Sequence, residues 1–543
     1  MTTQQQTDFP IPEDVEGFWL WDRLHCPRPL APLEHELLLG ATAYGFSKAM
    51  GDMGSAIAAQ TRLINYYNYL HGVDRDLGGE DPAERKARYE KNVEELLPRL
   101  GDLWANKWLP EMQPKLERAR TTDYATLSDA DLIARFDEMK VEVDERWLVH
   151  GYLLYSFFAA GIFADHYNEV IQPDDSKEGY EALQGFETKA TESSRGLWKL
   201  SRTVRGNAEL RRLFDTLQGP ELRAELAGSE AGRAFLHDLT AYLEEFGWRA
   251  DSAYELTRPT WREDPRIALN AIQGYVSIAD EHSPDAQYES AVRRREELLA
   301  AARNKLANDP AGLSRFNELY EQARSFTPIV EDHNHWIDQV GDICMRYPAL
   351  EIGRRLVAKG TIAQPEDAFM LHVAEIKEAM GGADQKGLIA QRRSEMDHFG
   401  TIVPPPTIGP PTGGNDPIED VLFRFFGAPV DMSNDPAVIN GTAASPGTAR
   451  GPAKVVRDLA EASKVKQGDV LVCEMTLPPW TPLFSTACAV VADTGGILSH
   501  CAIVAREYRI PCVVGTGIGT VQIKDGMMLT VDGSKGIVRI ESA

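Results

Sequence analysis

The stretch that decides the fold of the C-terminal region is VVADTGGILSHCAIVAREYRIPCVVGT, residues 490–516. A β-branched run opens it, and the pair Gly495-Gly496 follows. The next segment, from Ser499 to Tyr508, has the composition of a short helix, and a second apolar run ends the stretch. This order predicts a strand, a glycine loop, a helix that begins near His500, and another strand.

His500 has three possible roles on these residues alone: it packs or caps the helix, ligates a metal, or carries a phosphoryl group. Gly495 and Gly496 let an anion approach the main chain, and Ser499 is a candidate helix cap. The amides of the first helical turn would face a group on His500. An imidazole with a reference pKa of about 6.5 is a nucleophile near neutral pH. Zinc is disfavoured because no second histidine or cysteine pair lies at ligand spacing.

The chain changes texture along its length. Amphipathic patterns such as AERKARYEKNVEELLPRL and YESAVRRREELLAAARNKLA predict helices throughout residues 33–380. TIVPPPTIGPPTGGNDP, residues 401–417, is typical of a semi-stiff linker. Short β-branched runs separated by Gly, Pro and Asp follow after Asn440. We therefore expect a large, mainly α-helical domain (1–400), a Pro/Gly-rich linker and hinge (401–437), and a small β/β/α domain (438–543).

Composition narrows the class of protein. The 543 residues suffice for two or three domains, and the net charge of −25 without a basic run disfavours nucleic-acid or anionic-membrane surfaces. The six cysteines form no CxxC pair, which favours reduced thiols. The N-terminus is polar and resembles no signal peptide. These features predict a cytoplasmic protein.

One apolar stretch, WLVHGYLLYSFFAAGIFA (residues 147–164), is about long enough to span a bilayer. His150 and several small residues interrupt it, and charged residues flank it closely. We expect a buried core helix and no membrane span. Its aromatic and small side chains are also candidates to line an apolar ligand pocket.

The segment TGGILSHCAIVAREYRIPCVVGT resembles the phosphohistidine loop of the swivelling domain in phosphoenolpyruvate-utilising enzymes. GTAASPGTARGPAKVV and LPPWTPLF, upstream, are similar to the entry strands of that domain. Cys501 occupies a place usually held by Ala. The resemblance implies that His500 is the phosphorylated residue and that the loop is supported by Thr494, Gly495, Gly496, Ser499 and Arg506.

The preceding region resembles the acceptor-binding part of rifampin phosphotransferases, and more strongly the large subunit of two-component aryl dikinases such as phenylphosphate synthase. The resemblance is carried by WLWDRLHCPRPLAPL (19–33), FGWRADSAYELTRPTWREDP (246–265) and EDHNHWIDQ (331–339). It implies that the β-phosphoryl of ATP passes through His500 to a small phenolic substrate. The products would be an aryl phosphate, AMP and phosphate, which suits aromatic catabolism.

The resemblance also implies a partner. Dikinases of this family carry an ATP-grasp domain, whereas residues 1–400 have a helical pattern, and we expect no phosphoenolpyruvate barrel after residue 543. A separate ATP-grasp subunit would then bind ATP with Mg²⁺ or Mn²⁺. We expect no organic cofactor, and the sequence does not identify metal ligands in this chain.

Phosphoryl transfer to a hydroxyl needs a base to take its proton and cations to offset the oxyanion charge. The catalytic candidates, besides His500, are His333, His335, Asp332 and Arg249. The candidates for acceptor binding are His25, Arg28, Asp251, Glu255, Arg262 and His150. For each of these residues, core packing or a structural ion pair is the competing interpretation.

Three other functions remain open: phosphorylation of an antibiotic hydroxyl, phosphorylation of pyruvate, and a non-catalytic phosphohistidine relay to another protein. Pyruvate is disfavoured by the expected absence of a barrel.

Overall fold

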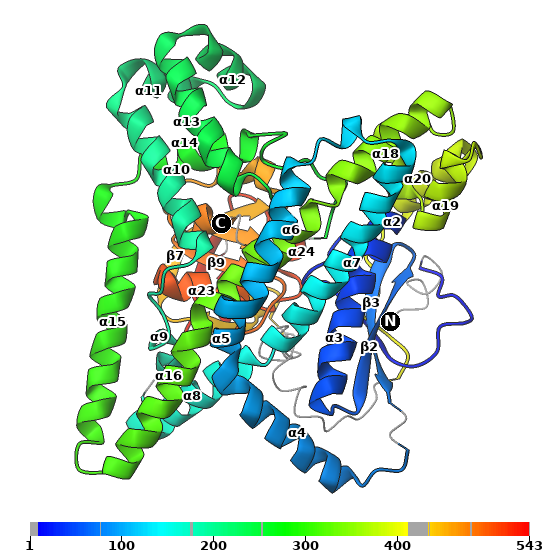
Figure 1. The fold of residues 1–543 in the computed structure, drawn as a ribbon. Coiled ribbons are helices and arrows are strands. Elements are labelled where there is room, and N and C mark those ends of the chain that lie inside the picture. Colours follow the sequence, from blue (N-terminus) through cyan, green and yellow to red (C-terminus); the bar gives the residue numbers. More distant parts are fainter. Residues whose placement is uncertain are drawn as a thin grey trace. The chain divides into compact units, whose positions relative to one another are not determined.

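The computed structural model describes residues 9–75, 78–173, 177–250, 254–410, 433, 435–477 and 480–541 (Figure 1). The chain forms two compact units, and each unit is assembled from three separate segments of the sequence. Unit 1 consists of residues 1–155, 252–258 and 336–416, and unit 2 of residues 156–251, 259–335 and 417–543. Residues 1–400, which we predicted as one domain, are thus divided between the units, because contacts distant in sequence define each core.

Unit 1 is built of helices and one small sheet. Two of its helices, α3 (Gly40–Met53) and α7 (Asp129–Leu153), lie side by side (Figure 1). Ser128 caps α7 by accepting a hydrogen bond from the amide of Asp131. The other helices are α2 (Pro32–Glu34), α4 (Pro82–Leu96), α5 (Leu100–Leu103), α6 (Leu109–Thr121), α17 (Val340–Ile343), α18 (Arg346–Lys359), α19 (Val373–Met380) and α20 (Lys386–Phe399).

The sheet of unit 1 is antiparallel with strand order β2-β3-β1-β4. Its strands are β1 (Trp19–Trp21), β2 (Ile57–Ile64), β3 (Tyr67–Asp74) and β4 (Thr407–Ile408). We predicted a mainly helical structure from about residue 33 to residue 380, and β2 and β3 are exceptions to it. Asn65 and Tyr66, both with positive φ, form a two-residue hairpin turn that suits the twist of the strands they join.

The predicted linker is only partly described, since residues 411–432 and 434 lie outside the described residues. Its first part is not a free connection. β4 pairs with β1, and Tyr69 donates a hydrogen bond to the carbonyl of Pro405. The extended backbone that proline favours suits this edge position.

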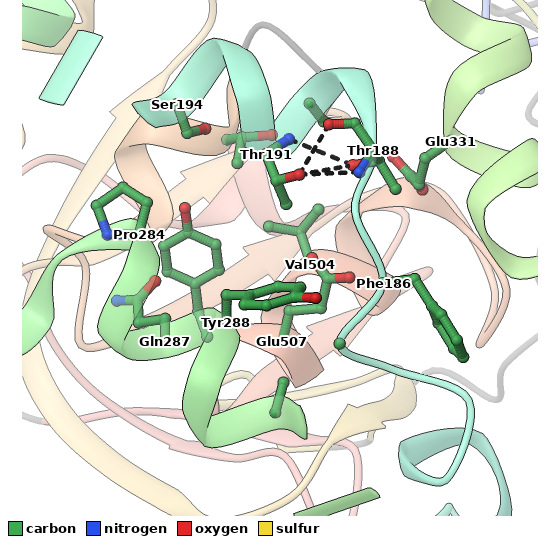
Figure 2. A pocket seen from close by; sticks show the side chains of 15 residues that line it. Phe186, Thr188, Thr191, Ser194, Pro284, Gln287, Tyr288, Glu331, Val504 and Glu507 are labelled. Atoms are coloured by element: carbon green, nitrogen blue, oxygen red, sulfur yellow. Dashed lines mark hydrogen bonds between the residues drawn. The ribbon is translucent and has the colours of Figure 1, made fainter. Parts of the chain in front are cut away.

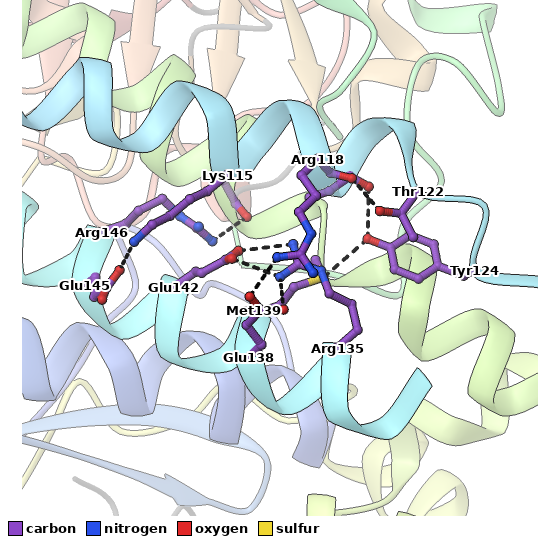
Figure 3. Close-up of polar contacts among 12 residues, drawn as sticks. Lys115, Arg118, Thr122, Tyr124, Arg135, Glu138, Met139, Glu142, Glu145 and Arg146 are labelled. Atoms are coloured by element: carbon purple, nitrogen blue, oxygen red, sulfur yellow. Dashed lines mark hydrogen bonds and ion pairs between the residues drawn. The ribbon is translucent and has the colours of Figure 1, made fainter. Parts of the chain in front are cut away.

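Ion pairs join α6 to α7 on the surface of unit 1 (Figure 3). Arg135 is buried and contacts Glu138 at 2.8 Å and Glu142 at 2.9 Å. A buried guanidinium requires such partners, because removing one carboxylate would leave an uncompensated charge. This network is structural.

The apolar stretch around residues 147–164 is broken at Leu154 and Tyr155, between α7 and α8 (Ser156–Ile171). By length and composition, the segment Asp129–Ile171 is one that can cross a membrane, yet 67% of its most apolar window is buried inside the protein. This burial agrees with the predicted core helix.

The helical part of unit 2 surrounds two apolar clusters. The amphipathic pattern predicted for residues 288–307 is confirmed by α15 (Pro284–Lys305), whose first turn is capped by Ser283. The remaining helices are α8, α9 (Glu178–Glu181), α10 (Lys189–Gly206), α11 (Ala208–Thr216), α12 (Gly219–Gly228), α13 (Glu230–Phe246), α14 (Arg266–Val276) and α16 (Pro310–His333).

The C-terminal part of unit 2 is a β-sheet domain, drawn in orange and red in Figure 1, which confirms the predicted fold class. Its eight strands run in the order β5-β12-β11-β7-β8-β9-β10-β6, with parallel pairing from β7 to β10. They are β5 (Val438–Asn440), β6 (Thr442–Ser445), β7 (Thr448–Val456), β8 (Val470–Cys473), β9 (Ala489–Ala492), β10 (Cys512–Val514), β11 (Met528–Asp532) and β12 (Ile537–Ile540).

The predicted helix of this domain is α23 (His500–Glu507), which begins at His500. Two shorter helices, α22 (Thr481–Phe484) and α24 (Gly519–Gln522), accompany it. The sheet packs apolar side chains on both faces, as its continuous β-branched runs require. α22 and α23 lie against α10, α14 and α15 of the same unit.

Candidate active site

His500 lies at the junction between the glycine loop and α23. Gly495 has φ of +97°, a conformation that glycine adopts readily, and it lets the chain turn sharply after β9. Ser499 occupies the N-cap position, but its hydroxyl donates to the carbonyl of Gly496 at 2.8 Å instead of capping the helix. The first-turn amides therefore keep their capacity to bind an anion.

Two threonines contact the imidazole of His500. The hydroxyl of Thr476 lies 3.2 Å from Nδ1, and that of Thr481 lies 3.5 Å from Nε2. The stronger contact at Nδ1 fixes the ring and favours Nε2 as the nucleophilic nitrogen. Sequence reasoning did not select either threonine, although Thr481 lies in the segment LPPWTPLF that carried the resemblance.

The surroundings of His500 keep it neutral. Burial lowers the pKa of His500 to about 3, and the contact with Thr476 opposes this only in part. A neutral imidazole offers a lone pair, so the ring is ready to attack phosphorus across the physiological pH range.

The loop residues have separate structural roles. Thr494 bonds the carbonyl of Glu474 through its amide and its hydroxyl, both at 3.0 Å, and so ties the glycine loop to the segment after β8. Asp493 accepts hydrogen bonds from Thr516 and Thr520. Cys501 is buried with its sulfur 3.8 Å from that of Cys512, and so packs in the core.

Arg506 lies at the opposite end of α23 from His500. It is 4% exposed, donates to the carbonyl of Ala444 at 3.0 Å, and stacks over Tyr180. The resemblance implied support of the phosphohistidine loop, whereas these contacts join the sheet domain to the helices of unit 2.

A small cavity lies beside Thr481, where α23 faces α10 and α15 (Figure 2). It measures about 30 Å³, enough for about one or two water molecules. Glu331 of α16 and Glu507 of α23 both line it. Burial raises the pKa of Glu331 to about 8 and that of Glu507 to about 7, and their mutual repulsion adds to the shift of Glu331. These carboxyls are proton-holding groups that sequence reasoning missed.

Three catalytic candidates, Asp332, His333 and His335, have contacts within unit 2. Asp332 accepts from the amide of Lys189 at 2.7 Å, and His333, which is buried, bonds the carbonyl of Ile329 within its own helix. His335 is buried with its ring 6.2 Å from that of Phe246.

The two arginines that we predicted to bind phosphate, Arg249 and Arg262, also have contacts within the protein. Arg249 is buried, donates to Phe246 and Ser193, and lies over the ring of Trp261. Arg262 pairs with Glu244 at 3.0 Å near the surface, as the competing interpretation held.

Four of the predicted acceptor residues come together in unit 1, although they are far apart in sequence. The ring of His25 meets that of Tyr254 edge to face at 5.7 Å, and Arg28 lies 3.4 Å from Glu255. Trp147 stacks on both Tyr254 and His150, at 5.6 and 4.6 Å. We call this group the aromatic–histidine cluster. It consists of His25, Arg28, Trp147, His150, Tyr254 and Glu255, together with Asp22 and Asp338. Asp251 lies outside the described residues.

Each histidine of the aromatic–histidine cluster has a carboxylate partner. His25 Nδ1 lies 2.9 Å from Asp22, and His150 Nε2 lies 3.5 Å from Asp338. Burial alone would lower the pKa of His25, but the charge and hydrogen bond of Asp22, with the charge of Asp338, raise it above its ordinary value. A histidine oriented by a carboxylate is a candidate general base.

The fold and the site together define a β-sheet domain that places His500 at the start of a helix, next to a helical region of the same unit. Residues 465–536 match the mobile domain of PEP-utilising enzymes, and residues 148–331 match the fourth domain of rifampicin phosphotransferase. These two parts of the chain are therefore similar to PEP-utilising enzymes and to rifampicin phosphotransferase.

Relatives extend the similarity over almost the whole chain. It is 34% identical to chondramide synthase cmdD of Chondromyces crocatus, over 98% of this chain and 14% of the relative. It is 30% identical to the uncharacterized phosphotransferase YvkC of Bacillus subtilis, over 99% and 64%. A rifampicin phosphotransferase of Streptomyces sviceus is 26% identical, over 65% and 40%. The chain therefore spans less than two thirds of the length of each relative.

Proposed function

We propose that this chain transfers a phosphoryl group from ATP, through His500, to the hydroxyl of an aromatic compound. The observation that carries the proposal is the neutral, oriented imidazole of His500 at the start of α23. There the helix dipole and the first-turn amides favour a phosphoryl anion. The match to the mobile domain of PEP-utilising enzymes supports the same role.

The first half-reaction loads the histidine. Nε2 of His500 attacks the β-phosphorus of ATP, the bond from that phosphorus to the AMP oxygen breaks, and hydrolysis of the γ-phosphoryl releases phosphate. We assign ATP, with Mg²⁺ or Mn²⁺, to a separate ATP-grasp polypeptide. Support comes from the described parts of residues 1–400, which are mainly helical.

The second half-reaction uses the acceptor. Its hydroxyl oxygen attacks the phosphorus on His500, the P–N bond breaks, and a base takes the hydroxyl proton. We propose His25 as that base, because Asp22 orients it and raises its pKa. The rings of Trp147 and Tyr254 suit an aromatic acceptor, of which a phenol is the simplest.

An antibiotic hydroxyl is the second candidate acceptor. The specific observation that favours it is the match of residues 148–331 to the fourth domain of rifampicin phosphotransferase. Both candidates present a hydroxyl oxygen to the phosphorus, and they differ in acceptor size.

The test is to incubate the chain and an ATP-grasp partner with ATP labelled in the β or the γ position. We expect β-label to appear on the chain as an acid-labile phosphoramidate and γ-label to appear as free phosphate. His500→Ala is expected to remove the protein label entirely. Retention of β-label in that variant would overturn the role of His500.

The acceptor is then identified by adding phenols, rifamycins or pyruvate to the labelled chain. Loss of protein label with formation of an aryl phosphate supports the phenol, and a phosphorylated rifamycin supports the second candidate. Label that leaves only with pyruvate, or only with another protein, contradicts both.

A further inference from the structure

A second, larger cavity lies in unit 2 at the end of α23 that is remote from His500. It measures about 430 Å³, within the range of small-molecule pockets. α15 contributes one wall, and the end of α23 and the β6–β7 turn contribute another. His500 and Arg506 are six residues apart, so about 9 Å of helix separates this cavity from the phosphohistidine position.

The charges of the lining are unusual for this acidic chain. Four arginines line the cavity together with two glutamates, which leaves a positive excess, whereas the whole chain carries −25. The arginines are Arg293, Arg294, Arg506 and Arg509, and the glutamates are Glu181 and Glu297.

Only part of this positive charge is matched by ion pairs. Arg294 pairs with Glu181 at 2.9 Å, and Arg293 lies 3.7 Å from Glu289. Arg509 donates to the carbonyl of Ser290, as Arg506 does to that of Ala444. Neither Arg506 nor Arg509 forms an ion pair with a carboxylate among the described residues. The positive charge of these two guanidiniums and their other N–H donors can therefore interact with a ligand.

Two buried polar atoms in the lining have no hydrogen-bond partner in the part of the chain that the structure describes. Arg506 is 4% exposed and its Nε lacks an acceptor among the described residues; Ser445 is fully buried, and its hydroxyl has no partner within the same set. Burial of such groups is costly unless a ligand or water satisfies them. Burial also lowers the pKa of Arg506, although its guanidinium remains charged, and an anion would offset that cost.

We propose that this cavity binds a phosphate-class oxyanion, held by Arg506, Arg509, Arg293 and Ser445. Guanidinium and hydroxyl donors match the geometry of phosphate oxygens. The partial negative charge at the end of α23 disfavours an anion. Charge-assisted hydrogen bonds from several guanidiniums are stronger and outweigh this effect.

The bound anion contacts both α15 and the sheet domain, so it bridges them. Inorganic phosphate and the phosphate of a nucleotide such as AMP offer the same chemistry. The site depends only on the lining residues and does not require that His500 be phosphorylated.

The experiment is calorimetric titration of the full chain with inorganic phosphate and, separately, with AMP, at constant ionic strength in chloride. We expect saturable binding of at least one of them by the wild type. Arg509→Gln should weaken binding about tenfold, and Arg293→Gln with Arg509→Gln by more, since both side chains are surface-accessible and tolerate the change. His500→Ala should bind as the wild type does.

Arg315→Gln is the matched control, because Arg315 is an exposed arginine that pairs with Glu318 on α16. It should leave the affinity unchanged. Binding of phosphate alone assigns the site to the free anion, and binding of AMP alone assigns it to a nucleotide. Failure of both to bind overturns the proposal, as does equal affinity in the double arginine variant or loss of binding in His500→Ala.

Discussion

His500 and His25 are both histidines, but their surroundings shift the pKa of the two rings in opposite directions. His500 is surrounded by threonine hydroxyls and apolar side chains, and burial lowers its pKa to about 3. Asp22 lies beside His25 and raises the pKa of that ring. The first environment favours the neutral ring, which suits the nucleophile that we propose, and the second makes the ring a stronger base, which suits the proposed proton acceptor.

The largest effect is expected when His25, the proposed general base, is removed. His25→Ala should slow phosphoryl transfer to the acceptor by about 10²–10⁴-fold, the usual contribution of a general base. Loading of His500 should be unaffected. Single-turnover transfer from the labelled chain measures this, and equal loss of both half-reactions would show a structural role instead.

The pH dependence of transfer to the acceptor tests whether His25 takes the hydroxyl proton. Since the base acts when deprotonated and Asp22 raises its pKa, the transfer rate should rise with pH through a value above about 6.5. Asp22→Asn should shift that inflection downward. An unshifted profile would assign the proton to another group.

Thr476→Val tests what orients the nucleophile. Loss of the contact at Nδ1 should slow labelling of His500 by about 3- to 10-fold, as expected for one neutral hydrogen bond. Thr481→Val, whose hydroxyl lies at 3.5 Å, is the matched control and should have a smaller effect. The reverse order would mean that Nδ1 is the reacting nitrogen.

The carboxyls beside Thr481 predict a pH dependence of stability. Glu331 and Glu507 have folded pKa values of about 8 and 7, above the ordinary value near 4.5. The folded state therefore holds protons that the unfolded chain releases, and stability is full below about pH 4.5 and declines as pH rises through 7 and 8. The midpoint of thermal unfolding should be several degrees lower at pH 8.5 than at pH 6.

The double variant Glu331→Gln with Glu507→Gln should flatten that decline, because neither amide titrates. His500 acts in the opposite sense: its lowered pKa reduces stability as pH falls from about 6.5 towards 3. Measurements above pH 6.5 separate the two effects. An unchanged slope in the double variant would place the titrating groups elsewhere.

The smallest effect is expected for Arg262. Its ion pair with Glu244 is near the surface, and such pairs contribute about 0–1 kcal/mol. Arg262→Gln should therefore change turnover less than twofold. A large loss with intact folding would restore Arg262 as a phosphate clamp.

The local pattern around His500 predicted the structure well, and the helix begins at that residue. Glycine, serine and β-branched residues influence the conformation of the backbone next to them, so their effect can be predicted from the sequence. The hairpin Ile57–Asp74 escaped prediction although its turn is equally local. Its aromatic and polar residues lack the clear alternation that marks a strand.

The contacts of the candidate sites were less predictable. Thr476 and Thr481 reach His500 from 24 and 19 residues away. Arg506 was predicted to support the phosphohistidine loop, and its partners Ala444 and Tyr180 lie on other elements. No local spacing encodes such pairings.

The sequence by itself determined the β/β/α order of the C-terminal domain and the loop-to-helix position of His500, because both follow from short-range backbone preferences. Only the tertiary structure decided which histidine receives a carboxylate neighbour, which arginines remain for a ligand, and that two units share residues 1–400. Burial and charge depend on side chains brought together from distant segments, and these set both pKa values and the free energy of an unpartnered group.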